Sequence, residues 1–123
     1  MILVKADARL IMQVIINLVD NAIKYTGKGS EITIATQKLG DRAVVCVADN
    51  GPGIPDDMKP LVFEMFYSGA KGIADSRRSL GLGLFLCKSI ITAHGGKLEL
   101  TDNSPHGAIF TFTLPIEEVD LHE

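Results

Sequence analysis

The stretch Asn17-Leu-Val-Asp-Asn21-Ala-Ile-Lys24-Tyr25 places two amides and an ammonium on one side of an otherwise apolar helical pattern. Asn17, Asn21 and Lys24 stand at i, i+4 and i+7, which is one face of an α-helix. Asparagine is a mediocre helix former, so helix propensity does not explain the pair. An amide oxygen suits Mg²⁺ when phosphates supply the negative charge, and a lysine adds a point charge to those phosphates. A solvated helix face is the alternative for this triplet alone.

The segments around this stretch predict a helix followed by a hairpin. Asp7 is a typical N-cap, and apolar residues at helical spacing predict a helix over residues 8–26, with Gly27 as its stop. Residues 31–38 alternate between apolar and polar, and residues 42–48 are rich in valine, with Gly-Asp between the two runs. This pattern predicts two antiparallel strands.

The stretch Asp49-Asn-Gly51-Pro-Gly53 directly follows the second strand and predicts a loop. A carboxylate at a strand end can accept a hydrogen bond from an exocyclic amine such as N6 of adenine. The two glycines allow backbone conformations that a side chain forbids, and they let the chain lie close to a base. A plain turn without a ligand is the alternative.

The next segments alternate between short helices and a loop without hydrophobic period. We expect a short helix over residues 57–66, a mobile loop over residues 67–80 and a helix over residues 82–93. Gly81-Leu-Gly83-Leu84 opens this last helix and offers free N–H groups and a positive dipole end to phosphate. Neither a Walker loop nor a Rossmann fingerprint fits, because the following residues and the spacing differ.

The C-terminal part predicts a second hairpin. Gly95-Gly96 ends the helix, and residues 97–101 and 108–114 read as strands joined through residues 103–107. Residues 116–123 are acidic and are expected to fray. The sum is an α+β sandwich with helices packed on one face of a mostly antiparallel sheet.

Composition narrows the classes of protein. The chain has 123 residues, 46% of them hydrophobic and 22% charged, which suits one globular domain. A formal net charge of -3 argues against a general nucleic-acid binder, and it means that a polyanion must be bound by local donors and a metal. Cys46 and Cys87 lie in apolar runs and are expected to be buried free thiols. No apolar stretch is long enough to span a bilayer, so we expect a cytoplasmic domain.

The four motifs together resemble a known family. The stretches that begin at Asn17, Asp49, Phe63 (Phe63-Glu-Met-Phe66) and Gly81 resemble the N, G1, F and G2 boxes of the ATP-binding catalytic domain of sensor histidine kinases. That domain has the Bergerat (GHKL) fold shared with gyrase and MutL, and the match runs from residue 7 to residue 115. The resemblance implies a mixed, mostly antiparallel sheet of about five strands with about three helices on one face.

The resemblance also implies roles for individual residues, with ATP and Mg²⁺ as cofactors. Asn17 and Asn21 would bind the metal, Asn17 and Lys24 would serve catalysis, and residues 67–80 would form a lid over ATP. The implied nucleotide contacts are Asn21, Tyr25, Asp49, Gly51, Gly53, Ile54, Phe66, Arg77, Arg78, Gly81, Leu82, Gly83, Leu84 and Thr111. The G2 box usually opens with Gly-x-Gly, whereas here Ser79 holds the first position and Leu80 the second. Tyr67-Ser-Gly69 stands where a basic residue usually follows the F box.

The residue at position 17 favours one reaction within the superfamily. Relatives that hydrolyse ATP carry a glutamate there, because a water nucleophile must be oriented and deprotonated. Neutral imidazole already presents a lone pair, so Asn17 fits phosphoryl transfer to histidine. The amino-acid sequences of residues 74–84, 102–107 and 117–123 resemble those of the potassium-sensing (Kdp-type) kinases. An anti-sigma-type serine kinase and a degenerate nucleotide-sensing or partner-binding module are the alternatives.

The acceptor histidine of the family has no counterpart here. His94 ends a helix, where a dipole partner is the expected role, and His106 and His122 lie in a turn and in the tail. We therefore expect a catalytic domain separated from its dimerisation and phosphoacceptor helices. Its partners would be those helices and, through phosphorelay, a response regulator, and the parent protein would lie in the bacterial inner membrane.

Overall fold

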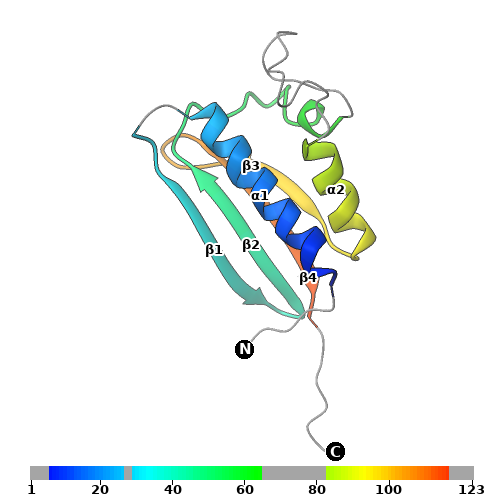
Figure 1. The fold of residues 1–123 in the computed structure, drawn as a ribbon. Helices are drawn as coiled ribbons and strands as arrows, with labels where there is room; N and C mark the ends of the chain where they lie inside the picture. Colours follow the sequence, from blue (N-terminus) through cyan, green and yellow to red (C-terminus); the bar gives the residue numbers. More distant parts are fainter. Residues whose placement is uncertain (1–5, 27–28, 65–82, 117–123) are drawn as a thin grey trace, which may run out of the picture.

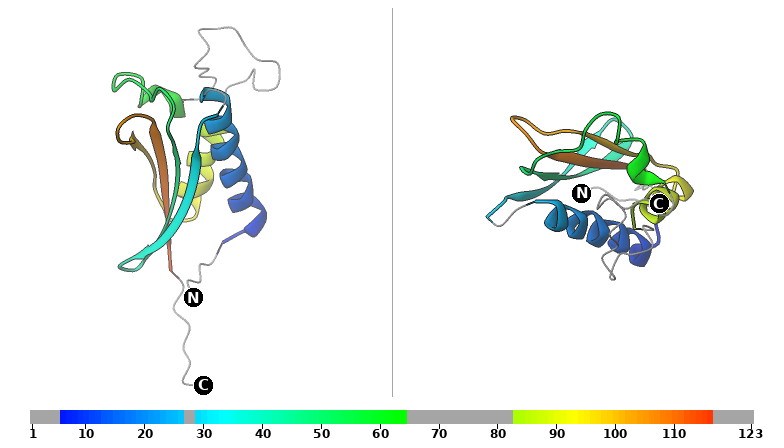
Figure 2. Two further views of the ribbon diagram at one scale, coloured as in Figure 1. Left: turned by 90° about the vertical axis from the view of Figure 1, so that its left-hand side faces the viewer. Right: turned by 90° about the horizontal axis from the view of Figure 1, so that it is seen from above.

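The computed structural model describes residues 6–26, 29–64 and 83–116. In this part of the chain two α-helices cover one face of a four-stranded antiparallel sheet, so that the molecule has two layers (Figures 1 and 2). The predicted α+β sandwich is confirmed. In the described residues no helix is both long and apolar enough to cross a membrane.

Helix α1 (Ala8–Tyr25) packs on one face of the sheet, along the direction of the strands, and carries the first motif. Asp7 is its N-cap as predicted, since its side chain accepts hydrogen bonds from the backbone N–H groups of Arg9 (3.0 Å) and Leu10 (3.3 Å). Val14 and Leu18 on its inner face are fully buried, which explains why an amphipathic sequence forms a helix here. Its predicted stop, Gly27, lies outside the described residues.

The sheet consists of β1 (Ile32–Leu39), β2 (Arg42–Asp49), β3 (Leu98–Asp102) and β4 (Ala108–Pro115), in the order β1-β2-β4-β3. Both predicted hairpins form. The expectation of a mixed sheet of about five strands is not met in the described residues, where all pairs are antiparallel. The sequence predicts only four strands, in two hairpins. Two strands joined by a short turn must pair antiparallel, which explains why these pairs are not mixed.

The predicted helix over residues 57–66 is also corrected. Turns occupy residues 56–60, and a 3-10 helix follows at Leu61–Phe63. Pro60 explains the difference, because proline lacks the N–H that a helix interior needs and disfavours helical backbone at the residue before it.

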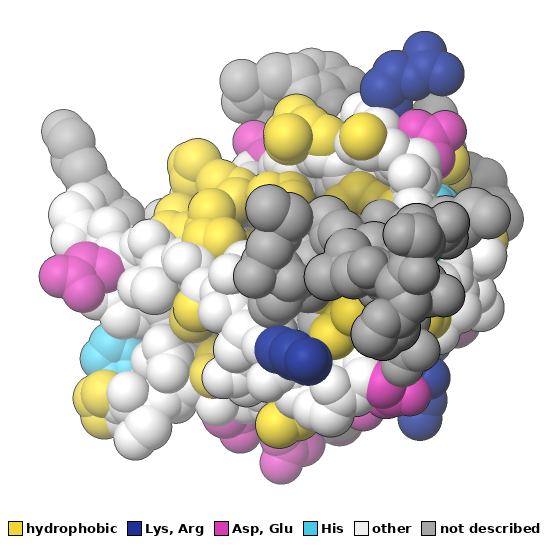
Figure 3. All heavy atoms as spheres, turned by 90° about the horizontal axis from the view of Figure 1, so that it is seen from below, with side chains coloured by type: hydrophobic (Ala, Val, Ile, Leu, Met, Phe, Trp, Pro, Cys, Tyr) yellow, Lys and Arg dark blue, Asp and Glu magenta, His cyan; other side chains and the backbone are white. Residues whose placement is uncertain are grey.

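The core lies between the helices and the sheet. Helix α2 (Gly83–Ala93) contributes Cys87 and Ile91, and β4 contributes Phe110 and Phe112, all of which are fully or almost fully buried. Cys46 departs from the prediction, because it is only half-buried, on the sheet face away from the helices. Some large apolar side chains of α1, such as Ile16 and Ile23, remain exposed, and the view in Figure 3 shows hydrophobic side chains among polar ones at the surface.

The C-terminal end of α2 is tied to the N-terminal end of α1 by His94. Its Nδ1 lies 2.8 Å from the carbonyl of Ile90 and donates to it, while its Nε2 accepts from the backbone N–H of Asp7 at 3.1 Å. Both ring nitrogens are therefore engaged, and the residue stabilises a helix end, as predicted. Gly95 follows with φ +81°, a left-handed conformation typical of a residue just after a helix.

Candidate functional site

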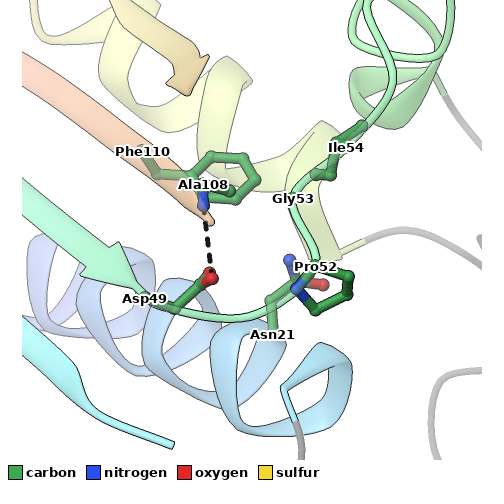
Figure 4. A pocket seen from close by; sticks show the side chains of 7 residues that line it. All are labelled: Asn21, Asp49, Pro52, Gly53, Ile54, Ala108 and Phe110. Atoms are coloured by element: carbon green, nitrogen blue, oxygen red, sulfur yellow. Dashed lines mark hydrogen bonds between the residues drawn. The ribbon is translucent and has the colours of Figure 1, made fainter. Parts of the chain in front are cut away.

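A pocket opens where β2 ends, between the last turns of α1 and the start of β4 (Figure 4). It comprises about 260 Å³, a volume that includes space open to solvent. Its lining comes from segments far apart in the sequence: Asn21, Asp49, Pro52, Gly53, Ile54, Ala108 and Phe110. The structure thus brings residues of the first and second motifs to one place.

Asp49 is the one buried charged residue in the described part of the chain, with 7% of its surface exposed. Its Oδ1 accepts two hydrogen bonds, from the backbone N–H of Gly51 (2.9 Å) and from that of Ala108 (3.2 Å; Figure 4). A buried carboxylate is unfavourable unless hydrogen-bonded, and bonds to a charged acceptor are among the stronger ones. These two donors fix the carboxylate at the pocket wall.

The glycines of the second motif are required by the space around them. A Cβ on Gly51 would lie 2.7 Å from Cγ2 of Thr26 and 3.2 Å from Oδ1 of Asp49. Gly53 has φ +80°, and a Cβ there would lie 3.1 Å from the carbonyl oxygen of Gly107. The loop therefore passes close to the end of α1 and to the β3–β4 turn, and Gly53 has the kind of backbone conformation for which a glycine was predicted.

The polar face of α1 divides between the pocket and the core. Asn17, Asn21 and Lys24 are all half-buried, and of these Asn21 lines the pocket. Asn17 lies one turn earlier on α1, where its side chain contacts Cys87 of α2. Burial raises the pKa of the Cys87 thiol to about 11, and the hydrogen bond from the Asn17 side chain opposes this rise. The Cys87 thiol also donates to the carbonyl of Val14 at 3.8 Å. Asn17 is therefore held at the junction of the two helices.

Further predicted contacts differ in where the structure places them. Ile54 lines the pocket, Gly83 is the first residue of α2, and Leu84 packs against the core. Thr111 is not brought to the pocket. It pairs with Cys46, and its hydroxyl lies 3.5 Å from that sulfur, on the sheet face opposite to Phe110 and Phe112, because side chains alternate along a strand.

The remaining predicted contacts cannot be compared with the pocket. Tyr25 is the last residue of α1, but its side chain lies outside the described part of the structure. The same holds for the whole of Phe66, Arg77, Arg78, Gly81 and Leu82, and for the lid predicted over residues 67–80.

Sequence reasoning missed the contribution of β4 and of the turn before it. Ala108 supplies a donor to Asp49, and Phe110 forms part of the pocket wall and meets Phe63 edge to face, with ring centroids 6.0 Å apart. Gly107 has φ +120°, and a Cβ there would lie 2.0 Å from the carbonyl oxygen of Asp49. The glycine after Pro-His was the available signal, but a glycine in a hairpin loop is usual and did not single out this position.

Lys59 braces the outer side of the pocket loop. Its ammonium donates to the carbonyl of Ile54 (3.0 Å) and to the carboxylates of Asp56 and Asp102, the latter at 2.9 Å. These hydrogen bonds, first that to Asp56 and then that to Asp102, raise the pKa of Lys59, and the bond to Lys59 lowers the pKa of Asp56. The brace connects the loop to the end of β3.

Comparison with known proteins identifies the family of the chain. Residues 6–118 match the family described as histidine kinase-, DNA gyrase B-, and HSP90-like ATPase. The chain belongs to this family. It is 47% identical over 116 residues to the sensor protein KdpD of Clostridium acetobutylicum, covering 94% of this chain and 13% of KdpD. It is 41% identical over 114 residues to the adaptive-response sensory kinase SasA of Crocosphaera subtropica, covering 92% of this chain and 29% of SasA.

Solved structures agree with this assignment. The nucleotide-free catalytic domain of histidine kinase ThkA superposes with a TM-score of 0.78 at 37% identity, covering 91% of this chain and 71% of that one. The structure of ThkA in complex with the response regulator protein TrrA superposes with a TM-score of 0.75 at 36% identity, covering 93% of this chain and 30% of that one. Full-length ShkA in complex with AMPPNP superposes with a TM-score of 0.81 at 27% identity, covering 97% of this chain and 24% of that one. This family member therefore has the fold of sensor histidine kinase catalytic domains and spans less than a third of KdpD or SasA.

Proposed function

We propose that the pocket binds Mg-ATP, with adenine against Asp49 and the triphosphate along α1. The buried carboxylate of Asp49 carries the proposal, because it stands in the pocket wall with Oδ1 engaged by two backbone donors. Its other oxygen would accept the exocyclic amine of adenine. The apolar surroundings of Ile54 and Phe110 suit the faces of a base. The nucleotide analogue in the related ShkA structure supports this choice of ligand.

The donors near the pocket fit a magnesium ion that arrives with the phosphates. Asn21 lines the pocket and Asn17 lies one turn away on the same face, so both offer neutral amide oxygens. Mg²⁺ retains several waters and takes few protein ligands when phosphates neutralise its charge. When bound, the ion would stabilise charge on the transferring phosphoryl group. Lys24 on the same helix face would add a positive charge, and Gly83 would present the positive end of α2.

We infer that the phosphoryl group passes to a histidine on a separate dimerisation segment, and from there to an aspartate of a response regulator. Asn17 supports this reaction over hydrolysis, since an amide is no general base for water. His94 has both ring nitrogens engaged in hydrogen bonds and is therefore not a suitable acceptor. His106 uses Nδ1 in a hydrogen bond to Gly51 and lies in the β3–β4 turn beside the pocket. The complex of ThkA with a response regulator supports the second partner.

A finer proposal concerns the signal. The 47% identity to KdpD exceeds the 41% identity to SasA, and it supports a Kdp-type kinase of potassium or osmotic signalling whose parent protein lies in the inner membrane. Phosphorylation of a Kdp-type response regulator in preference to a SasA partner tests this assignment. Equal transfer to both regulators would contradict it.

The kinase proposal is tested by supplying an acceptor histidine on a separate segment. The chain is mixed with a Kdp-type dimerisation segment carrying its histidine and with ATP labelled at the γ-phosphate. We expect label on the segment that is stable to alkali and lost in acid, and none on a segment whose acceptor histidine is replaced by glutamine. Acid-stable label would favour a serine kinase of the same fold, and no label despite ATP binding would favour a module without kinase chemistry.

A further inference from the structure

The β3–β4 turn, residues 103–107, holds the loop that carries Asp49 through two side chains. Nδ2 of Asn103 donates to the backbone carbonyl of Asp49 at 2.7 Å. Nδ1 of His106 lies 2.9 Å from the backbone carbonyl of Gly51, and because a carbonyl only accepts, this ring nitrogen donates. The two bonds grip the loop at residues 49 and 51, on either side of Asn50.

The turn itself is organised to present these donors. Oδ1 of Asn103 accepts from the backbone N–H of Ser104 at 2.9 Å, which orients the amide so that its nitrogen faces Asp49. The backbone N–H of Asn103 donates to the carbonyl of Gly107 at 3.0 Å and closes the turn. The turn is therefore closed by its own backbone bond, and the Asn103 amide is already oriented, so that little of its side-chain entropy is lost on forming the contact to the loop.

Backbone contacts from the turn and the start of β4 also hold Asp49. The N–H of Ala108, directly after the turn, donates to Oδ1 of Asp49 at 3.2 Å. Gly107 touches the Asp49 carbonyl so closely that a Cβ would lie 2.0 Å from that oxygen. Regular pairing of β2 with β4 ends at Ala48 and Ile109. Beyond that point hydrogen bonds from the turn take the place of the hydrogen bonds between the strands. The position of the Asp49 carboxylate thus depends on the turn as well as on its own strand.

We propose that Asn103 and His106 are positioning residues for adenine recognition, acting through the loop of residues 49–53. The inference rests on the proposed binding of ATP. A carboxylate that must meet a purine amine within hydrogen-bonding distance gains specificity from being fixed beforehand. Loosening the loop lets Asp49 turn from the base, so adenine nucleotides lose affinity while contacts to the phosphates on α1 remain.

Four variants separate positioning from general stability. Asn103→Asp keeps the shape of the side chain but replaces the donor by an acceptor that repels the Asp49 carbonyl. His106→Leu removes the donor, whereas His106→Asn keeps a nitrogen near the place of Nδ1. Ser104→Ala is the control in the same turn, because the bond of Ser104 to Asn103 uses its backbone N–H. Calorimetry measures the Kd of each variant for Mg-ATP, Mg-GTP and Mg-tripolyphosphate.

We expect Asn103→Asp and His106→Leu to weaken Mg-ATP about tenfold, with Mg-tripolyphosphate affinity unchanged. His106→Asn should restore Mg-ATP binding to within about twofold of the unaltered chain, and Ser104→Ala should leave it unchanged. Equal losses for ATP, GTP and tripolyphosphate, or no loss at all, would overturn the positioning role. Should Asn103→Asp fail to fold, the exposed His106 and its two variants carry the test. Failure of the unaltered chain to bind Mg-ATP would instead overturn the proposed function.

Discussion

The two ends of the pocket are built in different ways. At the proposed adenine end Asp49 is buried, accepts two backbone hydrogen bonds, and sits on a loop held by Asn103 and His106. At the proposed metal end, the polar face of α1 presents half-buried amides and a lysine. The first end is fixed by contacts between distant segments, whereas the side chains of the second are brought to one face by helical spacing.

This difference suggests a division of labour. A fixed carboxylate recognises a rigid base with little loss of entropy on binding. A face of neutral amides has affinity for Mg²⁺ chiefly when phosphates are present, so this end is completed by its ligand. We therefore expect substitutions at the adenine end to alter base selectivity and stability, and substitutions at the metal end to alter magnesium dependence.

The largest effect should come from Gly107→Ala at the adenine end. The added Cβ meets the Asp49 carbonyl at 2.0 Å in a backbone with φ +120°. We expect a loss of unfolding free energy on the order of 3 kcal/mol or more, together with loss of ATP binding. Denaturant melts measure the first and calorimetry the second. Gly40→Ala is the matched control, because Gly40 also has positive φ (+63°) but no heavy atom within 4 Å of the added Cβ. A loss equal to that of the control would contradict the close approach.

Asn21→Ala should break the metal end while leaving the fold intact. Removal of one amide ligand should weaken ATP about 100-fold in the presence of Mg²⁺ and hardly at all in its absence. Calorimetry with and without EDTA gives both values. Gln13→Ala on the exposed side of the same helix controls for the loss of an amide. Unchanged affinity in magnesium would remove Asn21 from the metal site.

Asp49→Asn should change base selectivity. The asparagine oxygen can keep the bonds to Gly51 and Ala108, which turns its NH₂ group toward the base. That group repels the adenine amine but can donate to O6 of guanine. We expect Mg-ATP to weaken by about 2 kcal/mol, roughly thirtyfold, and the ATP:GTP ratio to fall further than the ATP affinity itself. Equal losses for ATP and GTP would show that Asp49 does not read the base.

The sequence predicted the two ends unequally well. Helical spacing placed Asn17, Asn21 and Lys24 on one face, because that relation is local. The strand-end position of Asp49 was also readable from the valine-rich run and the glycines. The donors that fix Asp49 come from residues 103–108, whose approach depends on how two hairpins pair, and no local pattern encodes that. Thr111 was misplaced for a related reason, since the face of a strand residue follows from register, which the family resemblance alone did not give.

The smallest effect concerns the buried thiol of Cys87 on α2, which contacts Asn17 of the proposed metal end. Burial raises the pKa of Cys87 from 9.0 to about 11, so between these values the folded chain holds a proton that the unfolded chain releases. Stability must then fall as pH rises through this window. The difference in unfolding free energy between the unaltered chain and Cys87→Ala should shrink by about 1 kcal/mol from about pH 8 to pH 10. A difference independent of pH would mean that the thiol beside Asn17 is open to water.

The most direct test follows both ends in one titration by nuclear magnetic resonance. Mg-ATP is added to the ¹⁵N-labelled chain, and the backbone amides of Gly51 and Ala108 are observed together with the side-chain amide of Asn21. We predict that all three shift along one saturation curve, with a Kd below about 1 mM. Movement at one end without the other, or no movement at millimolar nucleotide, would contradict a single cleft for magnesium-bound ATP.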